Sequence, residues 1–250
     1  MNIEEFLLQL TDLDDGKAPL YQNLADALRK GIHDGLLDAA EALPSERDLS
    51  TSLSLSRVTV RKAIQVLVSE GLLVQRQGAG TFIAKRMEQA LTHLTSFTED
   101  MQSRQYASGV VWLDRSLAEA SLEEREVLRL AAGERIARLY RLRTANEQPM
   151  ALELAVLPER LVSNPAVLNG SLYEYLDLNG KRPVRATQRL RAVPCDDEQA
   201  TFLRISTGSP VLYIERHSFD GDGSPVEFTR SHYRGDSYDF VSEMVIKRSS

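Results

Sequence analysis

The chain has 250 residues, 42% of them hydrophobic, which is enough apolar material for one large domain or two modest ones. Its single cysteine, Cys195, excludes an internal disulfide and is typical of a reducing compartment. Residues 1–16 contain no basic residue and only a short apolar run, a pattern that predicts neither a signal peptide nor a membrane span. We therefore expect a soluble cytoplasmic protein with no membrane partner.

Charge is unevenly distributed along this acidic chain, whose formal net charge is −6. Residues 1–16 have a net charge of −5, residues 17–86 a net charge of +3, and the remainder a net charge of −4. The single net-basic segment is where a polyanion would bind, although such segments also occur in proteins that bind no nucleic acid.

Two helices are predicted at the start of the net-basic segment. Pro19 is suited to the first position of a helix that Gly35 ends. The second helix is short, with Ser45 as its N-cap, Asp48 three residues later as in a variant of the capping box, and an end near Leu53. The first helix has an apolar stripe that consists of Leu20, Leu24, Ala27, Leu28 and Ile32.

A third helix, over residues 56–70, has two faces of opposite character. One face is apolar, and the other is basic and polar. Gly71 is suited to end this helix, and the two short β-type runs of "LLVQRQGAGTFIA" predict a hairpin. The apolar face has Val60, Ala63, Ile64, Leu67 and Val68, and the opposite face has Arg57, Arg61, Lys62 and Gln65.

The order helix, helix, turn, helix and two-stranded wing predicts a winged helix-turn-helix. In such a unit the last helix buries one face and presents the other to the major groove of DNA. Arg57 and Arg61 lie one turn apart and suit phosphates or guanine edges, while Ser45, Ser56 and Thr59 can bind phosphate oxygens at helix starts. The alternative is an ordinary solvated helix face, which the order and spacing of the whole unit disfavour.

After a polar stretch over residues 84–94, which we predict to be a linker, β-type runs alternate with short helices. This pattern predicts an α+β domain built on a mostly antiparallel sheet. The predicted strands lie within 110–117, 134–145, 149–158, 182–194, 210–219 and 225–236, and the predicted helices within 122–133, 169–180 and 196–206.

Two arginines on one strand face point to a ligand-binding cavity. Strand alternation places Arg141 and Arg143 on the same half-apolar face. If the next strand returns through a hairpin with Thr144 opposite Met150, then Arg141 lies opposite Glu153. The arginines would bind an anionic group, and the carboxylate would receive hydroxyl or amide groups. A structural Arg–Glu pair across the strands is the alternative.

The final predicted strand supports a hydrophilic cavity, because Glu227, Thr229, Ser231 and Tyr233 share one polar face. The four histidines are scattered without the spacing of a zinc site, and the sequence has no nucleotide-binding motif, so we expect no metal or cofactor.

Motifs in two regions of the chain resemble known protein domains. The run "LPSERDLSTSLSLSRVTVRKAIQVLVSEGLLVQRQGAGTF" resembles the DNA-binding domain of the GntR superfamily of bacterial transcription regulators. "LTSFTEDMQSR" and "SHYRGDSYDF" resemble the two ends of the effector domain of the HutC branch, the UTRA domain, which has a chorismate-lyase-like fold. The "MEQAL…LTSFTEDM" run is similar to the N-acetylglucosamine-utilisation repressors of that branch. The resemblance implies a winged helix-turn-helix domain over 17–85, a linker over 86–93 and a UTRA effector and dimerisation domain over 94–250.

The resemblance also implies roles for individual residues. A homodimer would bind palindromic operator DNA, and a phosphorylated amino sugar would modulate that binding without any catalysis. Alternatives are a regulator of the same branch that responds to another anion, such as a histidine-pathway acid, and a lyase-like enzyme. The implied DNA contacts are Ser45, Arg47, Ser56, Arg57, Thr59 and Arg61, with Gln77 and Gly78 at the wing tip. The implied phosphate ligands are Ser96, Phe97, Thr98, Arg141, Arg143, Ser171 and Tyr173. Glu153, Glu227 and Tyr233 would contact the sugar, and Arg185 is a further candidate.

Overall fold

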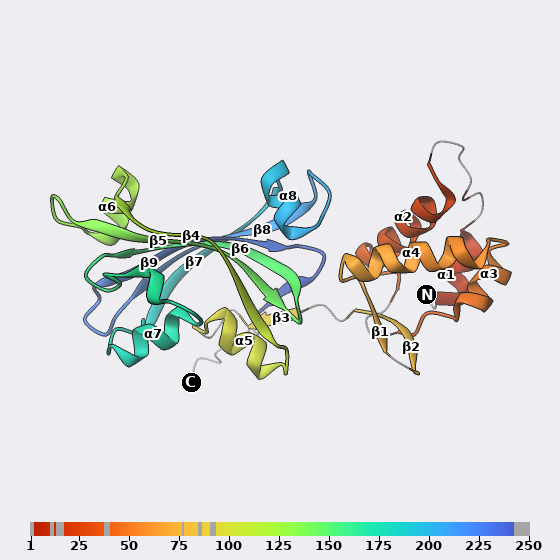
Figure 1. The fold of residues 1–250 in the computed structure, drawn as a ribbon, viewed down its shortest axis with the longest axis horizontal. Coiled ribbons are helices and arrows are strands. Elements are labelled where there is room, and N and C mark those ends of the chain that lie inside the picture. Colours follow the sequence, from red (N-terminus) through yellow and green to blue (C-terminus); the bar gives the residue numbers. More distant parts are fainter. Residues whose placement is uncertain are drawn as a thin grey trace, which may run out of the picture. The chain divides into compact units, whose positions relative to one another are not determined.

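The protein divides into two compact units, Met1–Met87 and Glu88–Ser250 (Figure 1). The structure, a computed structural model, describes residues 3–10, 13, 18–37, 41–76, 78–84, 87–90 and 94–242. None of the helices within these ranges is long and apolar enough to cross a membrane.

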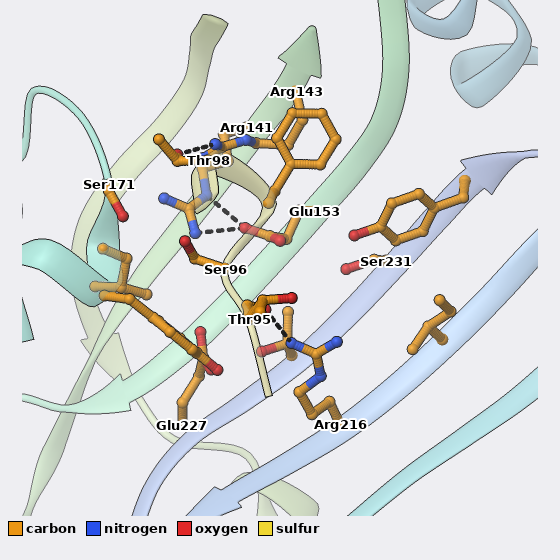
Figure 2. A pocket seen from close by; sticks show the side chains of 16 residues that line it. Thr95, Ser96, Thr98, Arg141, Arg143, Glu153, Ser171, Arg216, Glu227 and Ser231 are labelled. Atoms are coloured by element: carbon orange, nitrogen blue, oxygen red, sulfur yellow. Dashed lines mark hydrogen bonds and ion pairs between the residues drawn. The ribbon is translucent and has the colours of Figure 1, made fainter. Parts of the chain in front are cut away.

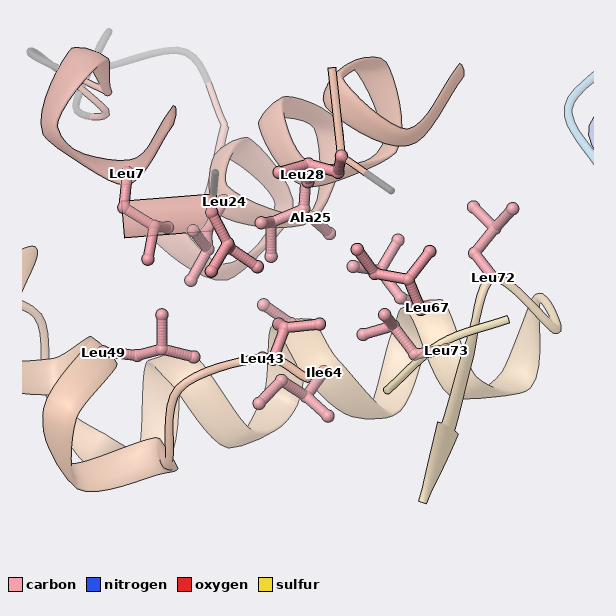
Figure 3. Packing of buried hydrophobic residues seen from close by; sticks show 14 of the residues in the cluster. Leu7, Leu24, Ala25, Leu28, Leu43, Leu49, Ile64, Leu67, Leu72 and Leu73 are labelled. Carbon is pink, nitrogen blue, oxygen red and sulfur yellow. The ribbon is translucent and has the colours of Figure 1, made fainter. Parts of the chain in front are cut away.

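The first unit contains the predicted helices and wing. Four helices, α1 (Ile3–Gln9), α2 (Leu20–His33), α3 (Glu46–Ser52) and α4 (Arg57–Ser69), precede the antiparallel strands β1 (Leu73–Arg76) and β2 (Gly80–Ile83). Ser45 and Ser56 are the N-caps of α3 and α4, as predicted. Pro19 is the N-cap of α2 and not its first residue, because its extended ψ of 137° places it outside the helix. The apolar faces of α2 and α4 form the core that Figure 3 shows.

Helix α1 is an addition that the acidic composition of residues 1–16 did not predict. Its residues Ile3, Phe6 and Leu7 are buried in the same core as α2 and α4. Phe6 packs directly on Gly31 of α2, where an added Cβ would lie 2.5 Å from the Cζ atom of the Phe6 ring. Asn23 Nδ2 also donates to the Leu13 carbonyl at 2.8 Å. The N-terminal segment is therefore a packed part of this unit.

The second unit is built on a six-stranded antiparallel sheet. The strands are β4 (Ser108–Glu119), β5 (Arg135–Ala145), β6 (Gln148–Pro158), β7 (Arg185–Pro194), β8 (Pro210–Phe219) and β9 (Pro225–Arg234). Their spatial order is β4-β5-β6-β9-β8-β7, so that β4 and β7 form the edges. All five pairings are antiparallel, which confirms the predicted sheet.

Helices cover both faces of this sheet (Figure 1). Helices α6 (Leu122–Leu128) and α8 (Asp197–Leu203) lie on one face, and α5 (Phe97–Ser103) and α7 (Leu172–Leu178) lie on the other. A short 3₁₀ helix, η1 (Pro165–Val167), precedes α7. Because strand side chains alternate, β5 places Leu142 against the α8 cluster while Ala137 and Leu139 pack with α7. The opposite sides of β5 therefore serve two separate cores.

Two details of the strands differ from the sequence predictions, and the first concerns a separate two-stranded sheet. The stretch 86–93, predicted to be a linker, contains a strand, β3 (Met87–Ala90), which pairs with β10 (Tyr238–Val241). Arg141 does lie opposite Glu153, but Thr144 pairs with Pro149 and not with Met150, because the register shifts after Arg143. This one-residue irregularity beside the turn leaves the predicted Arg–Glu pair intact.

Candidate functional sites

The basic face of α4 is exposed and its N-terminus is well capped. Ser56 Oγ accepts a hydrogen bond from the Thr59 backbone at 3.1 Å. The preceding helix, α3, is capped in the same way, because Ser45 Oγ accepts a hydrogen bond from the Asp48 backbone at 3.2 Å. Opposite the exposed face, α4 buries Val60, Ala63, Ile64 and Leu67. The predicted arginines Arg47, Arg57 and Arg61 are all exposed. This surface can meet a polyanion without any rearrangement of the core.

The wing is a tight hairpin that follows α4 along the chain. Gly78 is exposed and has a φ of 74°, a left-handed conformation that glycine adopts without strain. Gln77, the other predicted wing contact, lies outside the described residues.

The second unit holds a cavity of about 510 Å³, part of it open to solvent. Figure 2 shows the side chains that line it, which come from the sheet on one side and from the starts of α5 and α7 on the other. Ten of the eleven predicted effector residues line the cavity. The complete lining consists of Thr95, Ser96, Phe97, Thr98, Arg141, Arg143, Glu153, Ser171, Leu172, Tyr173, Ile214, Arg216, Glu227, Thr229, Ser231 and Tyr233.

At one end of the cavity two buried arginines keep donors unused. Arg141 Nε donates to Glu153 Oε1 at 2.6 Å, and Arg143 Nη2 donates to Thr98 Oγ1 at 2.8 Å. Within the described part of the chain, Arg141 Nη1 and Arg143 Nε are buried without a hydrogen-bond partner. Burial, together with the neighbouring charge of Arg141, lowers the pKa of Arg143 to about 10, so the Arg143 guanidinium stays charged at neutral pH. These two buried donors suit the acceptor oxygens of a bound anion.

The other end of the cavity is polar and uses a second carboxylate. Glu227 Oε2 accepts hydrogen bonds from the Tyr173 hydroxyl at 3.1 Å and the Ser218 hydroxyl at 3.3 Å. Burial and the nearby charge of Glu153 raise the pKa of Glu227. For Glu153 burial also acts upward, but the charges of Arg141 and Arg143 outweigh it and lower its pKa. The two carboxylates are thus held in different electrostatic environments.

A third arginine, the half-buried Arg216, completes the polar end. Arg216 Nε donates to Gln188 Oε1 at 2.8 Å, and its Nη1 donates to the Thr95 carbonyl at 3.5 Å (Figure 2). Three arginines and two carboxylates line one small space, which suits an anionic ligand that also has neutral polar groups. No cluster that could hold a metal ion occurs among the residues that the structure describes.

Comparisons with known proteins match each of the two units to a known domain. Residues 20–83 match the model of the bacterial regulatory proteins of the gntR family, and residues 103–239 match the UTRA domain. The chain is 38% identical over 230 residues to the HTH-type transcriptional repressor NagR of Bacillus subtilis, covering 90% of this chain and 95% of that protein.

The chain belongs to the GntR family of bacterial transcription regulators.

Other relatives place the chain in the same family. It is 30% identical over 239 residues to the mannosyl-D-glycerate transport/metabolism system repressor MngR of Escherichia coli, covering 94% of this chain and 99% of that protein. The crystal structure of PhnF from Mycobacterium smegmatis matches with a TM-score of 0.63 and 26% identity, over 89% of this chain and 99% of that one. This GntR-family protein is accordingly a ligand-responsive transcriptional repressor that binds DNA through its first unit, and not an enzyme.

One predicted effector residue of this GntR-family protein, Arg185, does not line the cavity. Arg185 is exposed on the edge strand β7, where its guanidinium lies over the Phe219 ring at 4.3 Å from the centroid. Gln188, three positions later, contacts Arg216 and so faces the cavity, which means that Arg185 lies on the opposite side of the strand. Arg185 is therefore not among the residues that line the cavity, and a role for it in effector binding stays a prediction.

Six lining residues were not among the predicted effector residues. Thr229 and Ser231 were predicted only to share the polar face of the final strand, and Thr95, Leu172, Ile214 and Arg216 were not predicted at all. Arg216 had a usable signal, because Leu212, Ile214, Arg216 and Ser218 alternate along β8 just as the cavity residues of β5 do.

Proposed function

We propose that this GntR-family repressor responds to a phosphorylated amino sugar, N-acetylglucosamine 6-phosphate or glucosamine 6-phosphate. The observation that supports this most directly is the pair of buried, unpartnered donors, Arg141 Nη1 and Arg143 Nε, at one end of the cavity. A phosphate offers several acceptor oxygens, and each charge-assisted hydrogen bond contributes roughly 1.5–3 kcal/mol. The hydroxyls of Thr98 and Ser171 border the same end and supply further donors.

The sugar would occupy the other end of the cavity. Glu153 and Glu227 can accept hydrogen bonds from hydroxyl or amide groups, and Ser231 and Tyr233 also line the cavity. The resemblance to the N-acetylglucosamine-utilisation repressors supports the same assignment.

Calorimetry on the full chain tests the proposal. N-acetylglucosamine 6-phosphate should bind, and N-acetylglucosamine should bind at least about tenfold more weakly, because about 1.4 kcal/mol corresponds to a decade in affinity. Equal affinities for the two sugars, or no binding of either, would show that the arginines are structural and that the amino-sugar assignment is wrong.

A carboxylate effector is the second candidate, because an arginine fork binds a carboxylate nearly as well as a phosphate. The relative named for mannosyl-D-glycerate, a sugar acid, favours including that compound. The same titration with mannosyl-D-glycerate and with a histidine-pathway acid decides between these classes by rank order of affinity.

We further propose that the protein acts in the cytoplasm as a homodimer on a palindromic operator, with contacts from Ser45, Arg47, Ser56, Arg57, Thr59, Arg61 and the wing tip. A single DNA-binding module buries only roughly 600–1,000 Å² on DNA and contacts one half-site. Two modules are needed for useful specificity, and the second unit would join them. Light scattering should show a dimer at micromolar concentration. A monomer both with and without DNA would contradict the proposal.

A further inference from the structure

One of the exposed arginines on the basic surface is already bound to a carboxylate. Glu46, the first residue of α3, accepts a hydrogen bond from Arg61 Nε at 3.0 Å and another from Arg61 Nη2 at 2.7 Å. The Arg61 side chain remains 52% exposed and the Glu46 side chain 26% exposed. A two-point bond of this kind fixes the plane of the guanidinium as well as its position.

Arg61 differs in this respect from the other two arginines of the surface. Among the residues that the structure describes, no carboxylate forms an ion pair with Arg47 or Arg57, and both side chains are exposed. The pairing therefore singles out one position of α4, and a carboxylate on a surface that binds DNA needs an explanation, because it repels phosphates.

The geometry of the pair leaves a defined part of the guanidinium available. The group has five N–H donors, and Glu46 takes the one on Nε and one of the two on Nη2. Both hydrogens on Nη1 and the second on Nη2 are left for other acceptors. Two adjacent donors of this kind match the O6 and N7 acceptors of guanine.

We propose that Glu46 is a positioning residue that makes Arg61 select a base edge over the phosphate backbone. The proposal rests on the DNA contact proposed above for Arg61. Glu46 acts in two ways: it holds the guanidinium in one orientation before DNA arrives, and it offsets the charge that would attract any phosphate. The first effect strengthens specific binding, and the second weakens non-specific binding.

The test compares two duplexes of equal length in a fluorescence-anisotropy titration of the full-length protein. One is a palindromic duplex that the wild-type protein enriches from a random pool, and the other has the same bases in shuffled order. In Glu46→Gln, the ratio of the two affinities should fall about tenfold, within the range that one bidentate base contact discriminates. Binding of the shuffled duplex should become tighter, and its log–log salt slope steeper by about 0.9, because Arg61 then neutralises one further phosphate.

Asp26→Asn is the matched control. This substitution also removes one negative charge, and Asp26 also pairs with an arginine, Arg29, but both residues lie on α2. If the effect of Glu46→Gln arises from net charge alone, Asp26→Asn will reproduce it, which would overturn the proposal. Thermal unfolding of each variant confirms that the helices remain folded.

A double-mutant cycle with Arg61→Ala separates the possible failures. Glu46→Gln should have no effect on the affinity ratio in the Arg61→Ala background, because Glu46 acts through Arg61. If Arg61→Ala weakens binding of the selected duplex but Glu46→Gln leaves the ratio unchanged, the role of Glu46 is wrong and the DNA contact stands. If Arg61→Ala has no effect on the selected duplex, the proposed contact itself is wrong and the inference fails with it.

Discussion

Replacing Arg141 by methionine should separate the two roles of the buried Arg141–Glu153 pair, which are stability and ligand binding. The Arg141 and Glu153 side chains are only 5% and 12% exposed, so the substitution leaves a buried carboxylate without its main cationic partner. Breaking a buried ion pair in this way costs roughly 3–5 kcal/mol of unfolding free energy. Methionine keeps much of the side-chain volume, so the loss arises from the uncompensated charge and not from a cavity.

The same substitution removes one of the two unpartnered donors at the phosphate end of the cavity. A charge-assisted hydrogen bond of roughly 1.5–3 kcal/mol corresponds to a loss of about 10- to 150-fold in effector affinity. The second variant is the double substitution Arg141→Met with Glu153→Leu, in which no charge of the pair remains. An apolar replacement of both partners should recover most of the lost stability.

Denaturant unfolding and calorimetry with N-acetylglucosamine 6-phosphate provide the two measurements. We expect stability to recover in the double variant while the affinity stays low. If the double variant regains the affinity, Arg141 does not contact the effector. If Arg141→Met unfolds with less than about 1 kcal/mol of lost stability, the pair is not the buried interaction described above.

Three further predictions concern other parts of the molecule. Arg57→Ala should weaken operator binding by roughly 1–3 kcal/mol in gel-shift titrations while light scattering shows an unchanged assembly. Gly31→Ala should destabilise the first unit, because the added Cβ would lie 2.5 Å from the Phe6 ring. In a Phe6→Ala background the same substitution should instead stabilise this unit by up to about 1 kcal/mol, because alanine has the higher helix propensity. The pKa of Glu227 is raised in the folded protein relative to the unfolded chain. The protonated carboxyl therefore contributes its full stability at a pH below the unfolded-state pKa, and this contribution is lost as the pH rises through the folded-state pKa. Glu227→Gln should therefore gain stability relative to wild type as the pH rises above the usual pKa of a glutamate, about 4.3, in denaturant unfolding. A stability difference that does not change with pH would contradict the burial of this carboxylate.

Local patterns predicted the parts of the fold that local interactions determine. The caps at Ser45 and Ser56 and the two faces of α4 were visible in the sequence because hydrogen bonds within one turn and a 3.6-residue period define them. The opposition of Arg141 and Glu153 followed from strand alternation and a short turn. A bulge leaves no such trace in composition, so the register at Thr144 was missed.

Contacts between distant segments account for most of the remaining differences. Strand β3 was missed because its partner β10 lies about 150 residues later, beyond the reach of any local pattern. Arg185 lies outside the cavity lining, because it is on the side of β7 opposite to Gln188, and the resemblance that suggested it does not show which side of the strand it occupies. Helix α5 had a local signal that was not used, since Ser96 and Glu99 form a full capping box at its start.

The chain order of the effector cavity has a consequence for synthesis on the ribosome. The Thr95 carbonyl accepts a hydrogen bond from Arg216, and Asp100 accepts one from Tyr238. Segments from the beginning and the end of the second unit are therefore hydrogen-bonded to one another. The first unit is complete by Met87, and N-terminal domains fold first as the nascent chain emerges. A polypeptide interrupted before β9 therefore keeps the whole basic surface of α4 yet lacks Glu227, Thr229, Ser231 and Tyr233. Such a fragment has the residues proposed to contact DNA and lacks several of the residues proposed to bind the effector.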